Sequence, residues 1–319
     1  MAKGFYISKT LGVVGVVLGA GAVATIIALS VVYAQEKSKN VEVEPVTTTV
    51  KPPPVVPTSP APPNDPWHRY RLPDSLMPDT YNVTLWPHLE PDAQGMYMFT
   101  GDSSVIFRCV KETDLIIIHS NKLELTLFGE FLAKLLAVDG SAPPAITKTW
   151  LQEQTQYLVV QLNGKLTAGK SYELQTQFRG ELADDLGGFY RSGYVEDGVK
   201  KVVATTQMQP TDARKAFPCF DEPAMKAVFH ITLIHRPGTV ALSNGKDIAS
   251  VNTTINGTAV TRTTFEPTKK MSTYLLAFIV SEFDFIQATE DNVMIRIWAR
   301  KTAIAEGQGN MPSIRPDRS

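Results

Sequence analysis

Two glutamines, Gln207 and Gln209, have the side-chain type and spacing that best suit ligand binding in this sequence. They belong to the stretch 205–209, which reads T-T-Q-M-Q. If that stretch is extended, both side chains point the same way, because successive residues of a strand alternate between faces. Their amide carbonyls can accept hydrogen bonds from a donor-rich ligand such as an ammonium group. The sequence equally allows two solvated glutamines at a strand end.

Other residue types that do chemistry lack the necessary spacing. A catalytic zinc site of the H-E-x-x-H kind needs two histidines on one helix face, and no histidine here is followed by Glu or lies four residues from another. We therefore expect no metal site in this chain. The five histidines are His68, His88, His119, His230 and His235. His230 and His235 are at odd spacing on one expected strand, so they should point to opposite faces.

Nucleophilic and acid–base sites are also not favoured. The sequence contains no G-x-S-x-G elbow. Cys219 is one of two cysteines, and a buried free thiol is the favoured interpretation over a nucleophile. Asp221 and Glu222 are adjacent, so their side chains should point in different directions. Arg214 and Lys215 are near enough in the sequence to form ion pairs with them. We expect structural salt bridges there rather than an acid–base pair.

The segment around the two glutamines carries a resemblance to a known family. Residues 207–223 read Q-M-Q-P-T-D-A-R-K-A-F-P-C-F-D-E-P. They resemble the signature that closes the substrate site in the zinc aminopeptidases of the aminopeptidase N family. Residues 11–33, 71–73, 271–278 and 295–300 also match, and the resemblance runs from Met1 to about Gly309.

The resemblance implies a fold, and it implies that two successive domains have different roles. The family's first ectodomain is a saddle-shaped β domain, and by resemblance Gln207 and Gln209 reach the free amino terminus of a peptide substrate. The next domain carries G-x-M-E-N and H-E-x-x-H and holds zinc with a later Glu. Neither motif occurs in these 319 residues. The resemblance therefore implies zinc, peptide substrates and a homodimer only for the full-length protein, and no zinc bound by this chain.

An uncharged, proline-free run over 11–33 predicts a membrane anchor after a short cytoplasmic tail, 1–10. As a helix it measures about 34 Å, enough to cross a bilayer core of about 30 Å. The alternative interpretation is a cleaved signal peptide that ends near Ala34. However, the apolar core of a signal peptide is usually only about 7–15 residues long. Sequons at Asn82, Asn252 and Asn256 all follow the run. If used, they place the folded part outside the plasma membrane, as in a single-pass type II protein.

Residues 34–66 predict an extended stalk between the lipid bilayer and the folded part. Nine of the 22 prolines lie between Pro45 and Pro66, among threonines and serines. Proline favours the extended polyproline II conformation, and Ser/Thr with Pro indicates O-glycosylation. The spacer interpretation holds with or without glycans.

The composition argues against several other classes of protein. The chain is 43% hydrophobic, which excludes a wholly disordered protein. Its net charge of -1 argues against nucleic-acid binding driven by bulk charge. Two cysteines cannot make a disulfide-stapled scaffold.

Period-two alternation predicts a mainly β fold over residues 67–305, a saddle-shaped antiparallel sandwich. The alternating segments are 81–86, 103–110, 156–162, 171–178, 201–206, 228–235, 260–265 and 293–298. The runs 114–120 and 273–280 are denser in apolar residues and predict strands buried on both faces. Turns are expected at 139–140, 163–164, 197–198, 237–238 and 244–245. Only 212–217 reads as briefly helical, with Pro218 ending it.

Two functions of different class follow. The first is the N-terminal part of a membrane-bound zinc aminopeptidase that removes amino-terminal residues from peptides and is inactive alone. The alternative is a membrane-anchored, glycosylated binding domain without catalysis. Residues 306–319 form an atypical tail. Its last part, 311–319, does not resemble the family and indicates alternative splicing, a frame change or a gene-model error. A reading frame that continues past Gly309 to both catalytic motifs favours the enzyme.

Overall fold

The computed structural model describes residues 64–307, and all of them belong to one compact unit. The predicted anchor over 11–33, most of the predicted stalk and the residues after 307 lie outside the described part. Within 64–307, no helix has the length and apolar character needed to cross a membrane.

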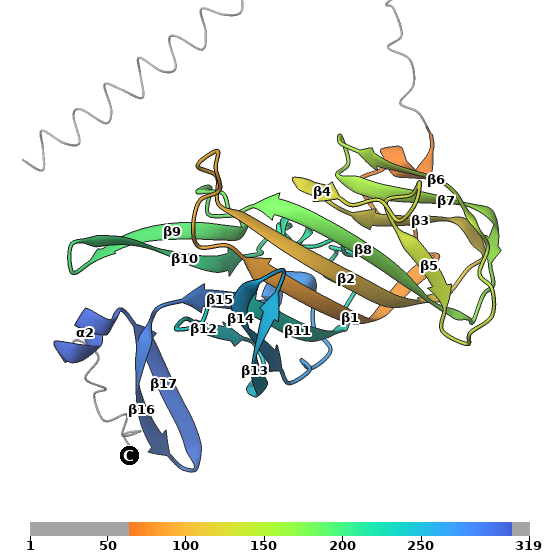
Figure 1. Cartoon of the computed structure of the whole chain (residues 1–319). Helices are drawn as coiled ribbons and strands as arrows, with labels where there is room; N and C mark the ends of the chain where they lie inside the picture. Colours follow the sequence, from red (N-terminus) through yellow and green to blue (C-terminus); the bar gives the residue numbers. More distant parts are fainter. Residues whose placement is uncertain (1–63, 308–319) are drawn as a thin grey trace, which may run out of the picture. The chain divides into compact units, whose positions relative to one another are not determined.

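The described residues form four sheets with few helical turns (Figure 1). The largest has eight strands, of which seven follow one path and β5 pairs with β8. Its strands are, in order, β13 (Asp247–Ile255), β14 (Thr258–Phe265), β11 (Val228–His235), β1 (Leu76–Pro87), β2 (Met98–Cys109), β8 (Ser171–Glu181) and β4 (Leu123–Leu125), with β5 (Lys134–Ala137) beside β8.

The smaller sheets have four, three and two strands. The four-stranded sheet runs β12 (Val240–Ser243), β15 (Phe278–Ser281), β10 (Val199–Gln207), β9 (Gly188–Glu196). The three-stranded sheet runs β3 (Thr113–His119), β7 (Tyr157–Leu166), β6 (Ile146–Gln152), and a hairpin pairs β16 (Asp284–Glu290) with β17 (Val293–Ala299). The helical elements are η1 (Pro66–His68), η2 (Ala213–Lys215), η3 (Thr273–Leu275) and α2 (Lys301–Ala305).

The predicted mainly β, antiparallel character is confirmed, with one exception among the described strand pairs. β1 pairs with β11 in parallel, with Asn82 opposite His230. Parallel neighbours need a long crossover, and the chain between β1 and β11 forms most of the other strands before it returns. In Figure 1, β1, β2 and β8 run side by side as the long strands of the large sheet.

Alternation along β1 shows how the sequence builds the core. Tyr81, Val83 and Leu85 are buried, while the intervening side chains lie on the other face of the sheet. The Tyr81 ring stacks on Phe229 with centroids 4.9 Å apart, and its hydroxyl accepts a hydrogen bond from the backbone N–H of Phe220 at 3.0 Å. The core therefore ties the large sheet to the segment that follows the two glutamines.

Most predicted strands are present, and 114–120 is buried on both faces as expected, since 116–119 of β3 are all buried. The prediction of one strand over 273–280 is wrong. The chain instead turns through η3 before β15 begins at Phe278. The cause is a side-chain contact: the hydroxyl of Thr273 donates to Oδ1 of Asp221 at 2.6 Å, which holds the turn.

The predicted turn at 163–164 is also wrong, because both residues lie inside β7. Asn163 extends the pairing instead of ending it. Its backbone N–H donates to the carbonyl of Ala145 at 2.9 Å, and its Oδ1 accepts from the Ala145 N–H at 2.9 Å. An Asn-Gly pair favours a turn only when no neighbouring strand offers such partners.

Candidate functional site

The two glutamines lie at the exposed end of β10. Gln207 is the last residue of that strand and pairs with Gly188 of β9. Gln209 lies beyond the strand and precedes Pro210 through a cis peptide bond. Both glutamine side chains are exposed, whereas Met208 between them is only 1% exposed. The strand therefore stops two residues short of the predicted extended stretch, but its exposed–buried–exposed alternation continues to Gln209.

Neighbouring contacts fix the backbone that carries these glutamines. The backbone N–H of Phe278 donates to the hydroxyl of Thr206 at 3.1 Å, which fastens the end of β10 to β15. The N–H of Asp212 donates to the carbonyl of Met208 at 2.8 Å. The side chains of Gln207 and Gln209 are thus presented to solvent from a backbone held on both sides.

A buried ion pair lies under the segment that follows. Nε of Arg214 is 2.9 Å from Oδ2 of Asp221, and the two side chains are 10% and 1% exposed. Arg214 also donates to Oε1 of Gln156 at 3.0 Å, and Asp221 accepts the Thr273 hydroxyl. The predicted pairing of Asp221 with Arg214 is confirmed. Lys215 instead pairs with Asp212 at 3.1 Å.

Glu222 has its own structural partners. Nη1 of Arg71 lies 3.1 Å from Oε2 of Glu222, and the backbone N–H of Leu72 donates to Oε1 at 2.8 Å. Asp221 and Glu222 therefore contact different groups, although they are adjacent in the sequence. This arrangement fastens the start of the described chain to the end of the 207–223 segment.

Cys219 and His119 are buried beside the ion pair, in surroundings that do not favour their reactivity. Burial raises the pKa of the Cys219 thiol well above its usual value, so the expected buried free thiol is confirmed. The backbones of His119 and Cys219 exchange hydrogen bonds of 2.8 and 3.0 Å. Burial, together with the charge of Arg214, lowers the pKa of His119 to about 3, and its Nδ1 accepts from the Asp221 N–H at 3.2 Å. His119 is therefore neutral near pH 7.

The histidines are not brought together. His230 is exposed and His235 buried, as their odd spacing on β11 predicts. Both ring nitrogens of His235 are within 2.9 Å of threonine hydroxyls, those of Thr239 and Thr263. In the described range, no three His, Cys, Asp or Glu side chains are placed to hold a metal ion. These residues do not fit a zinc site, and no chemical step can be assigned to zinc here.

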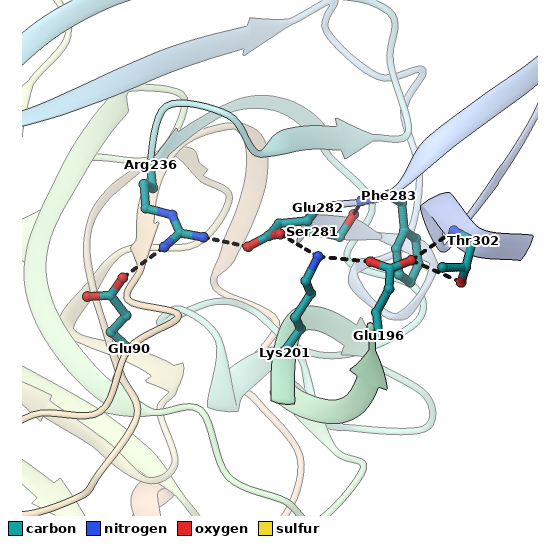
Figure 2. A network of polar contacts seen from close by, with 8 residues as sticks. All are labelled: Glu90, Glu196, Lys201, Arg236, Ser281, Glu282, Phe283 and Thr302. Atoms are coloured by element: carbon teal, nitrogen blue, oxygen red, sulfur yellow. Dashed lines mark hydrogen bonds and ion pairs between the residues drawn. The ribbon is translucent and has the colours of Figure 1, made fainter. Parts of the chain in front are cut away.

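A chain of alternating charges lies near the start of β10, at its end opposite Gln207 (Figure 2). Nζ of Lys201 is 2.9 Å from Glu196 and 3.0 Å from Glu282. Arg236 then links Glu282, at 2.6 Å, to Glu90, at 2.8 Å. Sequence reasoning missed this network, because its partners lie on different elements and no local pattern joins them.

The same network anchors the C-terminal elements. Oε1 of Glu196 accepts from both the backbone N–H and the hydroxyl of Thr302, at 3.0 and 3.2 Å. These bonds to Thr302, with that to Lys201, lower the pKa of Glu196 to about 2. Glu196 thus holds the first turn of α2 against the β9–β10 hairpin.

The three sequons are all exposed but differ in setting. Asn82 lies in the middle of β1, near the centre of the eight-stranded sheet. Asn252 lies on β13 at the edge of that sheet, and Asn256 lies in the turn between β13 and β14 with a positive φ of 48°. Each asparagine is therefore sterically open to a modifying group.

Comparison with known proteins places this geometry in a family. Residues 77–275 match the Peptidase M1 N-terminal domain. Aminopeptidase Ey of Gallus gallus is 56% identical over 317 residues, and aminopeptidase N of Homo sapiens is 55% identical over 316. Each alignment covers 97% of this chain and 33% of the relative. Aminopeptidase Q of Homo sapiens is 40% identical over 255 residues, which cover 78% of this chain and 26% of that protein.

The chain therefore spans about a third of the length of these curated relatives. The matched range includes all but the first residue of β1, the two exposed glutamines and the buried ion pair beneath them. It covers more than half of the sequence, and on that basis the chain belongs to the Peptidase M1 N-terminal domain family.

Proposed function

We propose that residues 67–305 are the saddle-shaped N-terminal β domain of a membrane-bound zinc aminopeptidase, and that Gln207 and Gln209 contact the free amino terminus of a peptide substrate. The observation that carries this proposal is the exposed pair at the end of β10, on a backbone fixed by Thr206 and Met208. Family membership supports the class of reaction.

The chemistry of the pair suits an α-ammonium. An ammonium has three N–H donors and no acceptor, and an amide carbonyl offers an acceptor without adding charge. A hydrogen bond that involves a charged group contributes about 1.5–3 kcal/mol. The backbone under both acceptors is already held, so binding has to order only the two glutamine side chains.

The remaining parts of the proposal concern the whole protein. Zinc and the hydrolytic step belong to a domain with H-E-x-x-H and G-x-M-E-N, so the 319 residues alone are inactive. Residues 11–33 anchor the protein in the plasma membrane as a type II protein, 34–66 form the stalk, and the whole protein can form a homodimer. Asn82, Asn252 and Asn256 carry glycans. Protease treatment of intact cells, with glycosidase digestion, tests this topology: full protection and no mass shift would overturn it.

Steady-state kinetics test the role of the glutamines. The host is aminopeptidase N of Homo sapiens in which residues 64–307 of this chain replace the aligned segment. Gln207→Ala should lower kcat/KM for an alanine amide about 10–150-fold, because about 1.4 kcal/mol corresponds to a decade. Gln209→Ala should cost the same or less, because it lies beyond the strand.

Gln154→Ala is the matched control, since Gln154 is an exposed glutamine outside this segment. It should change kcat/KM less than twofold, and the zinc content of all variants should equal that of the unmodified host. Unchanged kcat/KM in both Gln207→Ala and Gln209→Ala would contradict the proposed role and leave this segment as a structural closure of the sheet against the next domain.

A further inference from the structure

The open face of the eight-stranded sheet carries a hollow with a volume of about 510 Å³. Alternation on β1 puts Thr84 and Trp86 on this face, opposite the buried Tyr81 and Leu85. Asp102, Gln177 and Arg262 contribute to its polar lining, together with Thr100, Thr126 and Arg179. Its volume falls within the range of small-molecule sites, about 300–1,000 Å³, and its lining combines aromatic and aliphatic side chains with several polar groups.

Asn82 lies on the same face, beside the hollow. It is two residues from Thr84, a distance of about 7 Å along a strand. In the register of the sheet, Thr84 lies opposite Asp102, and Asp102 lies opposite Gln177. Asn82 is exposed, and its Nδ2 donates to the hydroxyl of Ser104 on β2 at 3.3 Å. Any group attached to Asn82 therefore emerges onto this face.

The lining matches the chemistry of a sugar. The indole of Trp86 is half-buried and offers an apolar surface for the C–H face of a pyranose ring. Asp102 accepts hydrogen bonds, Arg262 donates them, and the amide of Gln177 does both, as hydroxyl and acetamide groups require. The Thr84 hydroxyl contacts the Asp102 carboxylate, and Thr84, the third residue of the recognition motif, itself lines the hollow.

We infer that an N-linked oligosaccharide on Asn82 lies on the open sheet face, with its core N-acetylglucosamines seated in the hollow lined by Trp86, Asp102 and Arg262. The inference rests on the extracellular placement proposed above. It assigns this face to the chain's own glycan, so the face is covered and does not bind a protein partner.

The covalent step uses an oligosaccharide carried on a lipid diphosphate. A bond forms between Nδ2 of Asn82 and C1 of the first N-acetylglucosamine, and the bond from C1 to the diphosphate oxygen breaks. The diphosphate leaves with the bonding electron pair, and the amide nitrogen loses one proton. The modified amide keeps one N–H, so its hydrogen bond to Ser104 can persist.

Site-resolved deglycosylation of the full chain tests the inference. The protein is made in mammalian cells that are held at high-mannose glycans. An endoglycosidase that cuts between the two core N-acetylglucosamines is applied to native protein, and glycopeptides are quantified by mass spectrometry. The Asn82 glycan should be released more slowly than the Asn252 glycan by about fivefold or more, because seated sugars are released only when they leave the hollow. In denatured protein the two rates should be equal.

Two variants probe the hollow itself. Trp86→Ala should bring the release rate at Asn82 close to that at Asn252, and Arg262→Ala should move it in the same direction. Because Arg262 is exposed on β14, its variant should keep the fold if Trp86→Ala does not. Glu130→Ala is the control, because Glu130 is exposed and lies outside the hollow, so both occupancy and rate should stay unchanged.

The outcomes separate this inference from the proposed function. Glycans at Asn252 or Asn256 without one at Asn82 would overturn the inference and leave the extracellular placement standing. So would equal native release rates at Asn82 and Asn252. Empty sequons at all three positions would overturn the placement and the inference together, whereas the kinetic role of Gln207 is measured independently.

Discussion

The ammonium group of Lys201 lies 2.9 Å from Oε2 of Glu196, a carboxylate whose side chain is only 1% exposed. The second neighbour of that ammonium group, Glu282, lies 3.0 Å away on the segment that leads into β16. Lys201 thus sits between two carboxylates from different elements, as Figure 2 shows. The outer link from Arg236 to Glu90 is more exposed, at 49% and 75%. Exposed pairs contribute little to stability, so the inner part of the network should dominate.

Replacing Lys201 with methionine should lower the thermal midpoint of the full chain. Lys201→Met keeps most of the side-chain volume but leaves the buried Glu196 without a cationic partner, and an unpaired buried charge is costly. Lys200→Met is the matched control, because Lys200 is exposed on the same strand and should change stability by less than about 0.5 kcal/mol. Equal midpoints for the two variants would show that the network does not stabilise the fold.

Acid should weaken the same network within a defined pH window. The pKa of Glu196 falls from its usual 4.5 to about 2, chiefly through the bond from the Thr302 N–H and then that from Lys201. Burial acts to raise the pKa of Glu282, but Lys201 and Arg236 together lower it. Because these folded-state pKa values are depressed, their stabilisation is complete above pH 4.5 and is lost as the pH falls toward 2.

Urea unfolding of the full chain at several pH values between 5 and 2.5 measures that loss. Glu196→Gln removes the titrating group but keeps an acceptor for the Thr302 N–H. The variant should be less stable than the parent at pH 7, and its free energy of unfolding should depend less steeply on pH below 4.5. The same slope in both proteins would assign the acid sensitivity to other carboxylates.

The sequence predicts the strands where local alternation of apolar and polar residues determines which side chains are buried. It fails where contacts between residues distant in the sequence determine the local structure. β11 matches its predicted bounds because its apolar residues alternate toward one core. β13 was missed because eight of its nine side chains are exposed and so carry no alternation. The turn at η3 depends on Thr273 meeting Asp221, 52 residues away, and no local pattern encodes that contact.

The candidate site shows the same division. The motif over 207–223 locates Gln207 and Gln209, and simple charge proximity identifies Arg214 with Asp221. Neither the motif nor charge proximity identifies His119 or Thr273 as further contacts of Asp221, because these residues approach from β3 and η3. The hollow near Asn82 could not be predicted either, since six strands of the large sheet and Thr126 contribute its lining only after they are paired.

His119 should add a pH dependence at milder acidity than the network does. Its folded-state pKa is about 3, against 6.5 in the unfolded chain, because burial and Arg214 disfavour the imidazolium. Below pH 6.5 the unfolded state binds a proton that the folded state does not, so stability should fall by about 1.4 kcal/mol per pH unit down toward pH 3. Burial also lowers the pKa values of His88 and His235, which add to the slope.

His119→Asn isolates the contribution of this one histidine. The asparagine carbonyl can replace Nδ1 as acceptor for the Asp221 N–H, and asparagine does not titrate. The slope of unfolding free energy against pH between 6.5 and 5 should drop in the variant, while the slope below 4.5 due to Glu196 should remain. His230→Asn is the control, because His230 is exposed on β11. A slope unchanged by His119→Asn would mean that the buried imidazole is protonated with the fold intact.

Breaking the ion pair between Arg214 and Asp221 should destabilise the chain more than any surface change. Asp221→Asn leaves the guanidinium of Arg214, 10% exposed, without its counter-charge, and removing one partner of a buried pair costs about 3–5 kcal/mol. Lys215→Met breaks a neighbouring pair whose side chains are 19% and 24% exposed, so it should cost less than about 1 kcal/mol. Urea unfolding of the full chain measures both changes.

The double variant Arg214→Met/Asp221→Leu separates charge from packing. Replacing a whole buried pair with apolar residues is often near neutral. Here it also leaves the Thr273 hydroxyl and the Gln156 amide without their partners, at about 1–3 kcal/mol for each group that stays buried. The double variant should therefore recover part, but not all, of the stability lost in Asp221→Asn. Full recovery would mean that Thr273 and Gln156 find other partners, and no recovery would mean that the lost hydrogen bonds, rather than the unpaired charge, explain the cost.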